Sequence, residues 1–336
     1  MYSEWNPPNR FDPIHVEWDE GPPAAELQIT EDDGGGKILS HNDSPDLGFD
    51  WSVNPYRGCT HACAYCYARV YHEFLGWGAG SDFERKIVVK LRAAELLREA
   101  FSARGWAGEH VAFSGATDCY QPLERRYRIT RGCLEVCVEH LNPVSVVTRS
   151  PLVVRDLDLL RELALHRAVA VTISIPLGER SVQKALEPGA PAPEARLEAM
   201  AALSAAGIPV GVSLGPVIPG LSESMIPATL EAARAAGAQW AWRGWIRLPG
   251  SVEAVFSTRL REALPGRAEA VLNRIDRGGT DGRFVHRFVG PASEPGWAVT
   301  DGLFRLWTAR LGYGAMWSPP SPSPFRRPSK QLGLFS

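Results

Sequence analysis

The sequence predicts an α/β fold built on a parallel sheet, because short apolar runs alternate with helical stretches along most of the chain. The runs are continuously apolar, which is typical of the strands of a parallel sheet covered by helices. Hydrophobic residues make up 45% of the 336 residues and charged residues 22%, a composition found in globular proteins with a sizeable core. We therefore expect one barrel-like domain with extensions.

Six strand–helix units are predicted. The expected strands are residues 49–53, 111–113, 144–147, 169–173, 208–212 and 240–242. The expected helices between them are residues 89–103, 130–141, 156–165, 193–206 and 223–236. In a parallel barrel the loops that follow the strands gather at the carboxyl end of the sheet and form the working face. Side chains just beyond each strand are therefore the candidates for function.

Composition sets the boundaries of the barrel. Residues 1–45 are rich in Pro, Gly, Asp and Glu and are expected to form an irregular arm. Residues 46–250 carry the strand–helix alternation, and residues 251–317 are expected to be a helical extension. Residues 318–336 begin with repeated prolines that cannot form a helix or a central strand, and they are predicted to be a flexible tail.

Three cysteines follow the first predicted strand in the spacing C-x3-C-x2-C: Cys59, Cys63 and Cys66. Three thiolates so close together can hold three irons of a cubane iron–sulfur cluster and leave the fourth iron open for reaction. A zinc site with His61 as a further ligand is one alternative, and a disulfide with a spare thiol is another. No second Cys/His pair of the zinc-knuckle kind occurs in the sequence, so we favour the cluster.

This cysteine motif resembles the cluster loop of the radical S-adenosylmethionine (radical SAM) enzymes. Residues 215–223 resemble the G-x-I-x-G-x-x-E motif on the adenine side of the cofactor in that family, with Pro216 where glycine is commoner. The resemblance implies a partial (β/α)6 TIM-type barrel, a [4Fe–4S] cluster and S-adenosyl-L-methionine. It also implies that an external electron donor of the flavodoxin or ferredoxin type reduces the cluster, and that a 5′-deoxyadenosyl radical then abstracts hydrogen from the substrate.

The resemblance also gives roles to residues near the strand ends. Those expected to bind the cofactor are Tyr65, Tyr67, Ser114, Gly115, Asp118, Arg149, Ser174, Ile218 and Gly220. Ordinary structural roles are the alternatives: loop packing for the tyrosines, a helix cap for Asp118, a surface ion pair for Arg149 and a turn at Gly220. The family's usual double-glycine–glutamate motif is lacking, so the contact with the methionyl amino group stays open between Thr117 and Asp118.

Several stretches resemble the branch that contains spore photoproduct lyase, namely residues 63–67, 117–122 and 187–199, and this similarity covers residues 38–250. In that enzyme a cysteine beyond the second strand donates a hydrogen atom to the substrate radical. Cys119 occupies a comparable place, so the resemblance implies that Cys119 is catalytic. A buried cysteine that serves only in packing is the alternative.

Nucleic-acid binding has to be argued from local features, because the net charge of −2 does not favour a polyanion. Four arginines follow Cys119, at positions 125, 126, 128 and 131. They could neutralise DNA phosphates or form a solvated helix start. Trp240, Trp242 and Trp245 could stack on an extruded base or fill the barrel. A radical SAM enzyme acting on a peptide or small metabolite, and a non-catalytic Fe–S or zinc protein, are the alternative functions.

The two ends of the chain carry further predictions. Gln331–Phe335 resembles the peptide by which bacterial repair proteins dock on the DNA sliding clamp, and a tail folded back onto the barrel is the alternative. The start of the chain has no basic region followed by an apolar run, and no stretch of about 18 apolar residues occurs. We therefore expect no membrane partner and a cytoplasmic location, where an oxygen-sensitive cluster would survive.

Overall fold

The computed structural model describes residues 5–11, 26–34, 36–43, 48–113, 115–277 and 295–328. Its main sheet has seven strands in the order β10-β9-β8-β7-β6-β3-β2. They are β2 (Leu39–His41), β3 (Trp51–Val53), β6 (Val111–Phe113), β7 (Val144–Thr148), β8 (Val169–Ser174), β9 (Val210–Ser213) and β10 (Trp240–Trp242). From β3 to β10 all neighbours are parallel, whereas β2 pairs antiparallel with β3. The predicted parallel α/β class, with a partial barrel of six parallel strands, is confirmed.

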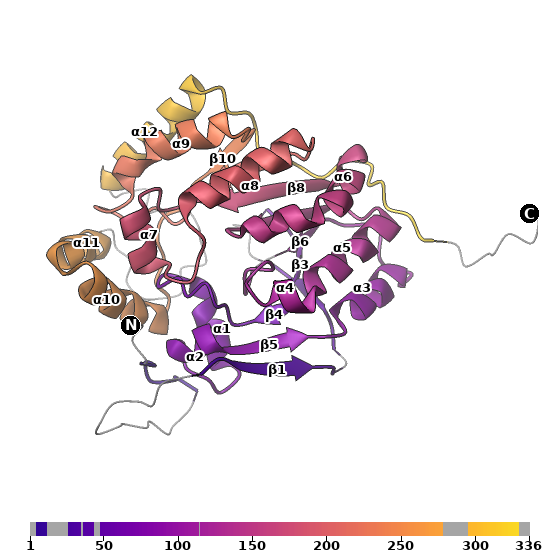
Figure 1. Ribbon diagram of the computed structural model, residues 1–336, viewed down its shortest axis with the longest axis horizontal. Helices are drawn as coiled ribbons and strands as arrows, with labels where there is room; N and C mark the ends of the chain where they lie inside the picture. The colour runs from indigo at the N-terminus through magenta and orange to yellow at the C-terminus, as the bar shows by residue number, and fades with distance from the viewer. Residues whose placement is uncertain are drawn as a thin grey trace, which may run out of the picture.

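Helices follow the strands and cover the sheet, as predicted. They are α3 (Ala93–Ser102), α4 (Glu124–Tyr127), α5 (Ile129–His140), α6 (Leu157–Leu165), α7 (Arg180–Leu186), α8 (Pro193–Ala205) and α9 (Ile226–Ala235). The 3-10 turns η2 (Pro151–Asp156) and η3 (Glu223–Met225) lead into α6 and α9. Helix α3 buries Ala93, Leu97 and Phe101, which lie four residues apart on one side. Figure 1 shows α5, α6 and α8 along the outside of the sheet.

A second sheet of three strands, ordered β1-β5-β4, was not predicted. It comprises β1 (Gln28–Asp32), β4 (Tyr56–Arg57) and β5 (Lys86–Lys90) and lies below the barrel in Figure 1. Two predictions are corrected by the strands. Residues 89 and 90 are strand and not helix, and residues 28–32 and 39–41 of the expected irregular arm are also strand. Strands β1 and β5 pair with each other across a long stretch of sequence, so their local patterns did not reveal them, whereas β2 pairs with the nearby β3.

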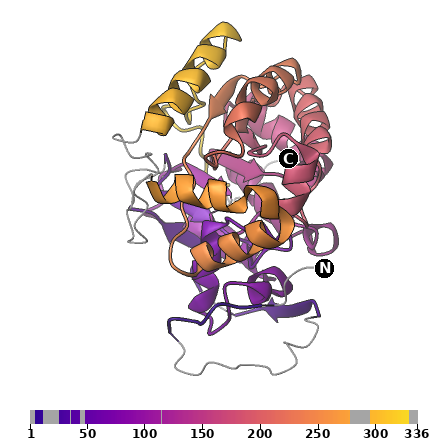
Figure 2. The same ribbon diagram turned by 90° about the vertical axis from the view of Figure 1, so that its left-hand side faces the viewer.

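The remaining helices lie toward the carboxyl end of the barrel strands, except α12 (Pro295–Arg310), which packs against α9 on the outside of the barrel. Between β4 and β5 the chain forms η1 (Tyr67–Arg69), α1 (Val70–Glu73) and α2 (Ser81–Arg85), and after β10 it forms α10 (Ser251–Ala263), α11 (Pro265–Arg277) and α12 (Pro295–Arg310). In Figure 1 the arrow of β8 points toward α7, α10 and α11. Figure 2 looks at this side and shows α10 and α11 lying across it. None of the helices in the described ranges is long and apolar enough to cross a membrane.

The described end of the chain lies against the barrel. The Phe325 ring is stacked on His140 at a centroid distance of 6.1 Å and meets the edge of Phe101 at 6.3 Å. A Cβ at Gly108 would lie 2.2 Å from the Phe325 Cβ, so the absence of a side chain there makes room for the ring. This part of the expected tail is therefore held by α3 and α5. The candidate clamp peptide Gln331–Phe335 lies outside the described residues.

We expect Phe325→Ala to lower the free energy of unfolding by about 1–3 kcal/mol, because it empties a half-buried ring site. Arg326→Ala is the matched control, since its side chain is exposed and its contact with His140 is made by the backbone. Thermal unfolding followed by circular dichroism measures both variants. Equal melting temperatures for the two would show that this segment does not stabilise the barrel.

Candidate cluster and cofactor site

The three cysteines lie on an irregular loop between β4 and η1. Cys59 and Cys63 are buried and Cys66 is partly buried; all six cysteines of the chain are free, which removes the disulfide alternative. The loop begins at Gly58, where φ is +75° and a Cβ would lie 3.0 Å from the Phe83 carbonyl oxygen. The Cys59 N–H donates to the same carbonyl at 2.9 Å. The end of α2 therefore fixes the point at which the loop leaves the small sheet.

Arg69 holds the middle of the loop. Its side chain is fully buried, and its Nε and Nη2 donate to the Cys63 carbonyl at 3.0 and 2.9 Å. Its Nη1 donates to the carbonyls of Ala79 and Gly80 at 2.8 and 3.0 Å, and Nη2 donates to the Glu84 carboxylate at 2.5 Å. Arg69 thus positions the backbone between two of the cysteines. It was not predicted, because an arginine shortly after the motif carries no sequence signal of its burial.

The segment between α7 and α8 supports the cluster loop from another direction. The Ala64 N–H donates to the Leu186 carbonyl at 2.8 Å, and the Gly189 N–H donates to the His61 carbonyl at 3.1 Å. A Cβ at Gly189 would lie 2.1 Å from the Thr60 carbonyl oxygen. Only glycine allows the two backbones to approach this closely.

Glu187 is the centre of a buried charged network beneath the loop. Its carboxylate accepts hydrogen bonds from the Tyr65 hydroxyl and from the Arg196 guanidinium. Arg196 also donates to the Ser174 carbonyl at 2.9 Å. Burial alone would raise the pKa of Glu187, but the charges of Arg196 and Arg149 outweigh burial and lower it. Tyr65 and Ser174, both predicted to bind the cofactor, are therefore joined to one another through this network.

Asp118 joins the ends of β6 and β7 to the cluster loop. Its Oδ1 accepts from the Thr148 hydroxyl at 2.6 Å, and its Oδ2 accepts from the Arg149 N–H at 3.0 Å. His61 Nδ1 lies 3.3 Å from the same Oδ2. Burial would raise the pKa of Asp118, but His61 and these hydrogen bonds hold it well below its usual range. The carboxylate positions His61 and Arg149, and its direct contact with the cofactor stays a prediction.

The electrostatics of the loop fit an anionic group. Arg149 Nη1 donates to Cys63 Sγ, while its buried Nε has no hydrogen-bond partner among the described residues. Burial raises the pKa of the Cys63 and Cys66 thiols. Burial also acts to raise that of Cys59, but the neighbouring His61 outweighs it and the Cys59 pKa is lowered. Binding of iron would remove the thiol protons, and the spare Arg149 donor could receive a further anion.

A single metal ion is a different case from a cluster. Within the described ranges, no three or more His, Cys, Asp or Glu side chains are gathered as ligands of one metal ion. A cubane does not require such a gathering, because each thiolate binds a different iron. Cys59, Cys63 and Cys66 are thus compatible with a three-thiolate cluster, and their binding of iron stays a prediction from the spacing.

Gly115 lies in the turn after β6, beside the Asn54 side chain. A Cβ at Gly115 would lie 3.6 Å from Asn54 Oδ1, and that oxygen accepts from the backbone N–H of residue 116 at 2.8 Å. Asn54, which was not predicted, thus shapes the turn after β6.

Tyr67 is exposed, with its ring edge-on to Tyr71 at 6.3 Å. Ser114 lies outside the described residues, so its predicted contact with the cofactor stays a prediction.

The second family-like stretch forms a tight turn beside α11. Ile218 is fully buried, and Gly220 has φ +73° with its N–H donating to Glu223 Oε2 at 2.6 Å. A Cβ at Gly220 would lie 2.9 Å from the Arg274 side chain. The left-handed turn therefore favours glycine at position 220, and its contact with adenine stays a prediction.

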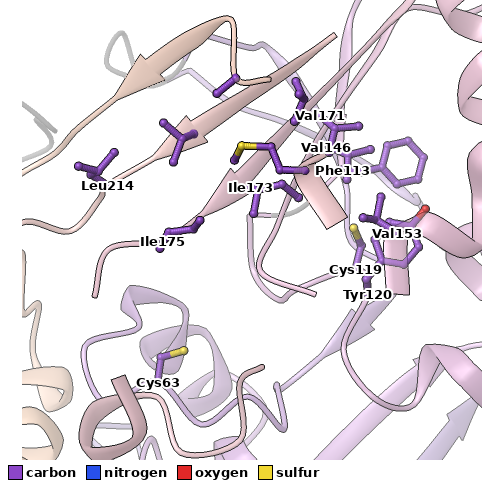
Figure 3. Close-up of a cluster of buried hydrophobic side chains, with 14 of the residues drawn as sticks. Cys63, Phe113, Cys119, Tyr120, Val146, Val153, Val171, Ile173, Ile175 and Leu214 are labelled. Carbon is purple, nitrogen blue, oxygen red and sulfur yellow. The ribbon is translucent and has the colours of Figure 1, made fainter. Parts of the chain in front are cut away.

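Cys119 lies beyond the carboxyl end of β6 with its side chain fully buried. Figure 3 shows its sulfur close to Tyr120 and Val153 and apart from Cys63. The Thr130 hydroxyl donates to the Cys119 carbonyl at 2.5 Å, which fixes its backbone. The thiol is thus part of a hydrophobic cluster, and its role as a hydrogen donor stays a prediction.

We expect Arg69→Lys to lower the iron content after anaerobic reconstitution and to destabilise the fold by about 2–4 kcal/mol. The variant keeps the charge but loses the planar fork that binds several carbonyls at once. Arg98→Lys is the matched control, because Arg98 is an exposed arginine paired with Glu139. Iron and sulfide per chain, together with the melting temperature, measure the effect. Full iron content and unchanged melting in the Arg69 variant would contradict its positioning role.

Comparison with known sequences agrees with the geometry. A family model described as "Radical SAM superfamily" matches residues 53–233. The uncharacterized protein Rv2578c of Mycobacterium tuberculosis (strain ATCC 25618 / H37Rv) is 37% identical over 221 residues, covering 65% of this chain and 65% of that protein. The uncharacterized protein MJ0683 of Methanocaldococcus jannaschii is 30% identical over 174 residues, covering 52% of this chain and 62% of that protein. The matches span less than two thirds of either relative.

Solved structures with a similar fold include spore photoproduct lyase. A mutant of that enzyme has a TM-score of 0.62 at 16% identity, covering 84% of this chain and 79% of that chain. Its complex with dinucleoside spore photoproduct has a TM-score of 0.61 at 15% identity. At such identities the likeness shows the fold alone. The family model, however, covers more than half of the 336 residues, including all three motif cysteines. This chain therefore belongs to the radical SAM superfamily, whose [4Fe–4S] cluster and S-adenosylmethionine are its cofactors.

Proposed function

We propose that this radical SAM enzyme acts on nucleic acid, as a repair lyase of the spore photoproduct lyase type. The observation that carries the proposal is the fold, which is similar to that of spore photoproduct lyase over 84% of this chain. The placement of Cys119 beyond β6 supports the same proposal, since the resemblance gives a thiol there a catalytic role. The oxygen-sensitive cluster also fits the cytoplasmic location expected from the sequence.

The residues of the cluster loop would bind and orient the cofactors. Cys59, Cys63 and Cys66 would hold three irons, and Arg149 would pair its spare donor with the carboxylate of S-adenosylmethionine. The Glu187 network holds the loop from beneath. When bound and reduced by an external donor of the flavodoxin or ferredoxin type, the cofactors supply a 5′-deoxyadenosyl radical that abstracts hydrogen from the substrate.

Cys119 would act at the end of the reaction. Its S–H bond would break homolytically, the hydrogen atom would form a C–H bond on the substrate radical, and a thiyl radical would remain on sulfur. Because the Cys119 side chain is fully buried, this role requires the segment after β6 to open toward the substrate.

The arginines near α4 would supply the contact with the nucleic-acid backbone. Arg125, Arg126 and Arg128 are exposed, and none of them forms an ion pair with a carboxylate in the part of the chain that the structure describes. Arg131 differs, because Asp156 and Asp158 bind it at 2.9 and 2.7 Å. Three of the four predicted arginines are therefore available to neutralise phosphates.

The tryptophans of β10 have a packing role. A Cβ at Gly211 would lie 2.1 Å from Trp240 Nε1, and one at Gly215 would lie 2.2 Å from Trp242 Cζ3. Both indoles thus cover the backbone of β9 and its following loop. We therefore assign these two rings to packing and not to stacking on an extruded base. Docking of Gln331–Phe335 on the DNA sliding clamp stays a prediction from the sequence.

Reductive cleavage of S-adenosylmethionine tests the superfamily chemistry. We expect the reconstituted enzyme to form 5′-deoxyadenosine with dithionite, and Cys63→Ala to abolish it because one iron loses its ligand. Arg149→Gln should lower the rate at least about tenfold through the lost ion pair. Arg98→Gln, at an exposed site, is the control and should match the wild type. An intact cluster without cleavage would contradict an enzymatic role.

Binding and repair of ultraviolet-treated DNA test the substrate class. The triple variant Arg125→Gln, Arg126→Gln and Arg128→Gln should bind DNA with a shallower salt dependence. The negative slope of the logarithm of the DNA association constant against log salt concentration should become smaller in magnitude by about 3, because about one counterion is released per phosphate contact. Cys119→Ser should leave binding unchanged and abolish repair. Lys184→Gln, at an exposed lysine of α7, is the control for lost charge. An enzyme that cleaves S-adenosylmethionine but does not bind DNA would favour a peptide or small metabolite as substrate.

A further inference from the structure

The small sheet β1-β5-β4 has two different faces. On one face Tyr56, Ile87 and Val89 form an apolar cluster beneath α4. Successive residues of a strand point to opposite faces, so Arg57 and Lys90 belong to the other face. That face borders a cleft of about 290 Å³. The sheet therefore packs one apolar face against α4 and presents its other, charged face to the cleft.

The charge of the cleft is strongly positive. Its charged lining residues are Lys37, Arg57, Lys90, Arg92 and Asp32. Arg92 is engaged by Glu95, with hydrogen bonds of 2.8 and 2.7 Å. The side chains of Lys37, Arg57 and Lys90 form no ion pair and no hydrogen bond within the described ranges. Three cations thus face one cleft with their donors unused.

This arrangement is unfavourable while the cleft holds only solvent. The pKa of Lys90 is lowered to about 8, first by burial and then by the charge of Arg57. Asp32 relieves the repulsion only in part, because its charge acts to raise the pKa of Lys90 but is outweighed by burial and Arg57. A bound anion would offset both the burial of Lys90 and its repulsion from Arg57.

We propose that this cleft is a binding site for a phosphate group, carried by the ligand as a phosphomonoester or a phosphodiester. The planar fork of Arg57 matches two phosphate oxygens, and Lys90 and Lys37 supply ammonium donors to the others. A carboxylate has only two oxygens and one charge, so it would leave part of the cation cluster without a partner. The first turn of α3, which has no side-chain cap and contributes Leu96 to the lining, adds to the positive potential.

The cleft is distinct from the cluster site. Arg57 precedes Cys59 by two residues, but the residues that line the cleft include none of the three motif cysteines. The proposal does not rest on a nucleic-acid substrate, because phosphate groups occur on metabolites as well as in nucleic-acid backbones.

Isothermal titration calorimetry of the reconstituted full chain tests the site, with ionic strength matched by sodium chloride. The probes are inorganic phosphate, thymidine 5′-monophosphate and an oligothymidylate without terminal phosphates. We expect saturable binding of at least one probe, weakened about tenfold or more by Lys90→Met and by Arg57→Gln. Lys37→Gln changes an exposed residue and should weaken binding without affecting folding. Lys184→Gln on α7 removes the same charge elsewhere and is the matched control.

The outcomes separate the sources of the phosphate. Binding counts as binding to the cleft when Lys90→Met and Arg57→Gln weaken it. Such binding of the monophosphate or of inorganic phosphate supports a phosphomonoester ligand. Such binding of the oligothymidylate alone supports a phosphodiester ligand. No binding of any probe, or equal weakening by Lys184→Gln and Lys90→Met, would overturn the proposal. Iron content and melting temperature equal to those of the wild type show that a variant is folded. Loss of DNA binding in the arginine variants of α4, with the cleft site intact, would concern only the nucleic-acid proposal.

Discussion

The cluster loop depends on one buried arginine more than on any regular secondary structure. Backbone carbonyls that are buried outside a helix or sheet need other partners, and Arg69 provides them for Cys63, Ala79 and Gly80. Its charge is balanced by Glu84, whose carboxylate also accepts from Arg259 of α10 at 3.1 Å. One carboxylate thus links the cluster loop to the C-terminal extension, which explains why α10 lies against this side of the barrel.

The same design recurs around the rest of the loop. Glu187 is buried and Asp118 is partly buried, and both carboxylates accept hydrogen bonds from more than one group. Removing one partner of a buried ion pair costs about 3–5 kcal/mol, whereas the intact pair contributes little net stability. These networks are therefore better explained by the need to hold three thiols and Arg149 in one arrangement than by the stability of the barrel.

Local patterns in the sequence were enough to predict most of the barrel and to single out the cysteine motif that the superfamily shares. The cysteines lie within eight residues of one another, and the continuously apolar runs gave six parallel strands. Contacts between distant segments could not be predicted. The end of strand β5 was predicted as the start of a helix, because its pairing with β1, far back in the chain, leaves no mark in the local pattern. The close approach of Gly189 to Thr60 likewise has no sequence signal. For Cys119, the sequence predicted the position and left a buried packing role open, and the packing of several elements decides that its side chain is buried.

Strand β4 is where these separate features meet. It has only two residues, and they face opposite ways: Tyr56 donates to Glu124 at the start of α4, and Arg57 lines the cationic cleft. The next residue, Gly58, has a left-handed φ of +75°, and the Cys59 N–H that follows it donates to the Phe83 carbonyl. The arginines near α4 and the cations of the cleft thus flank one short strand. Residues 56–58 therefore join α4, the cleft and the cluster loop within one short stretch of backbone, and any contact on either side of β4 bears on the segment that leads into Cys59.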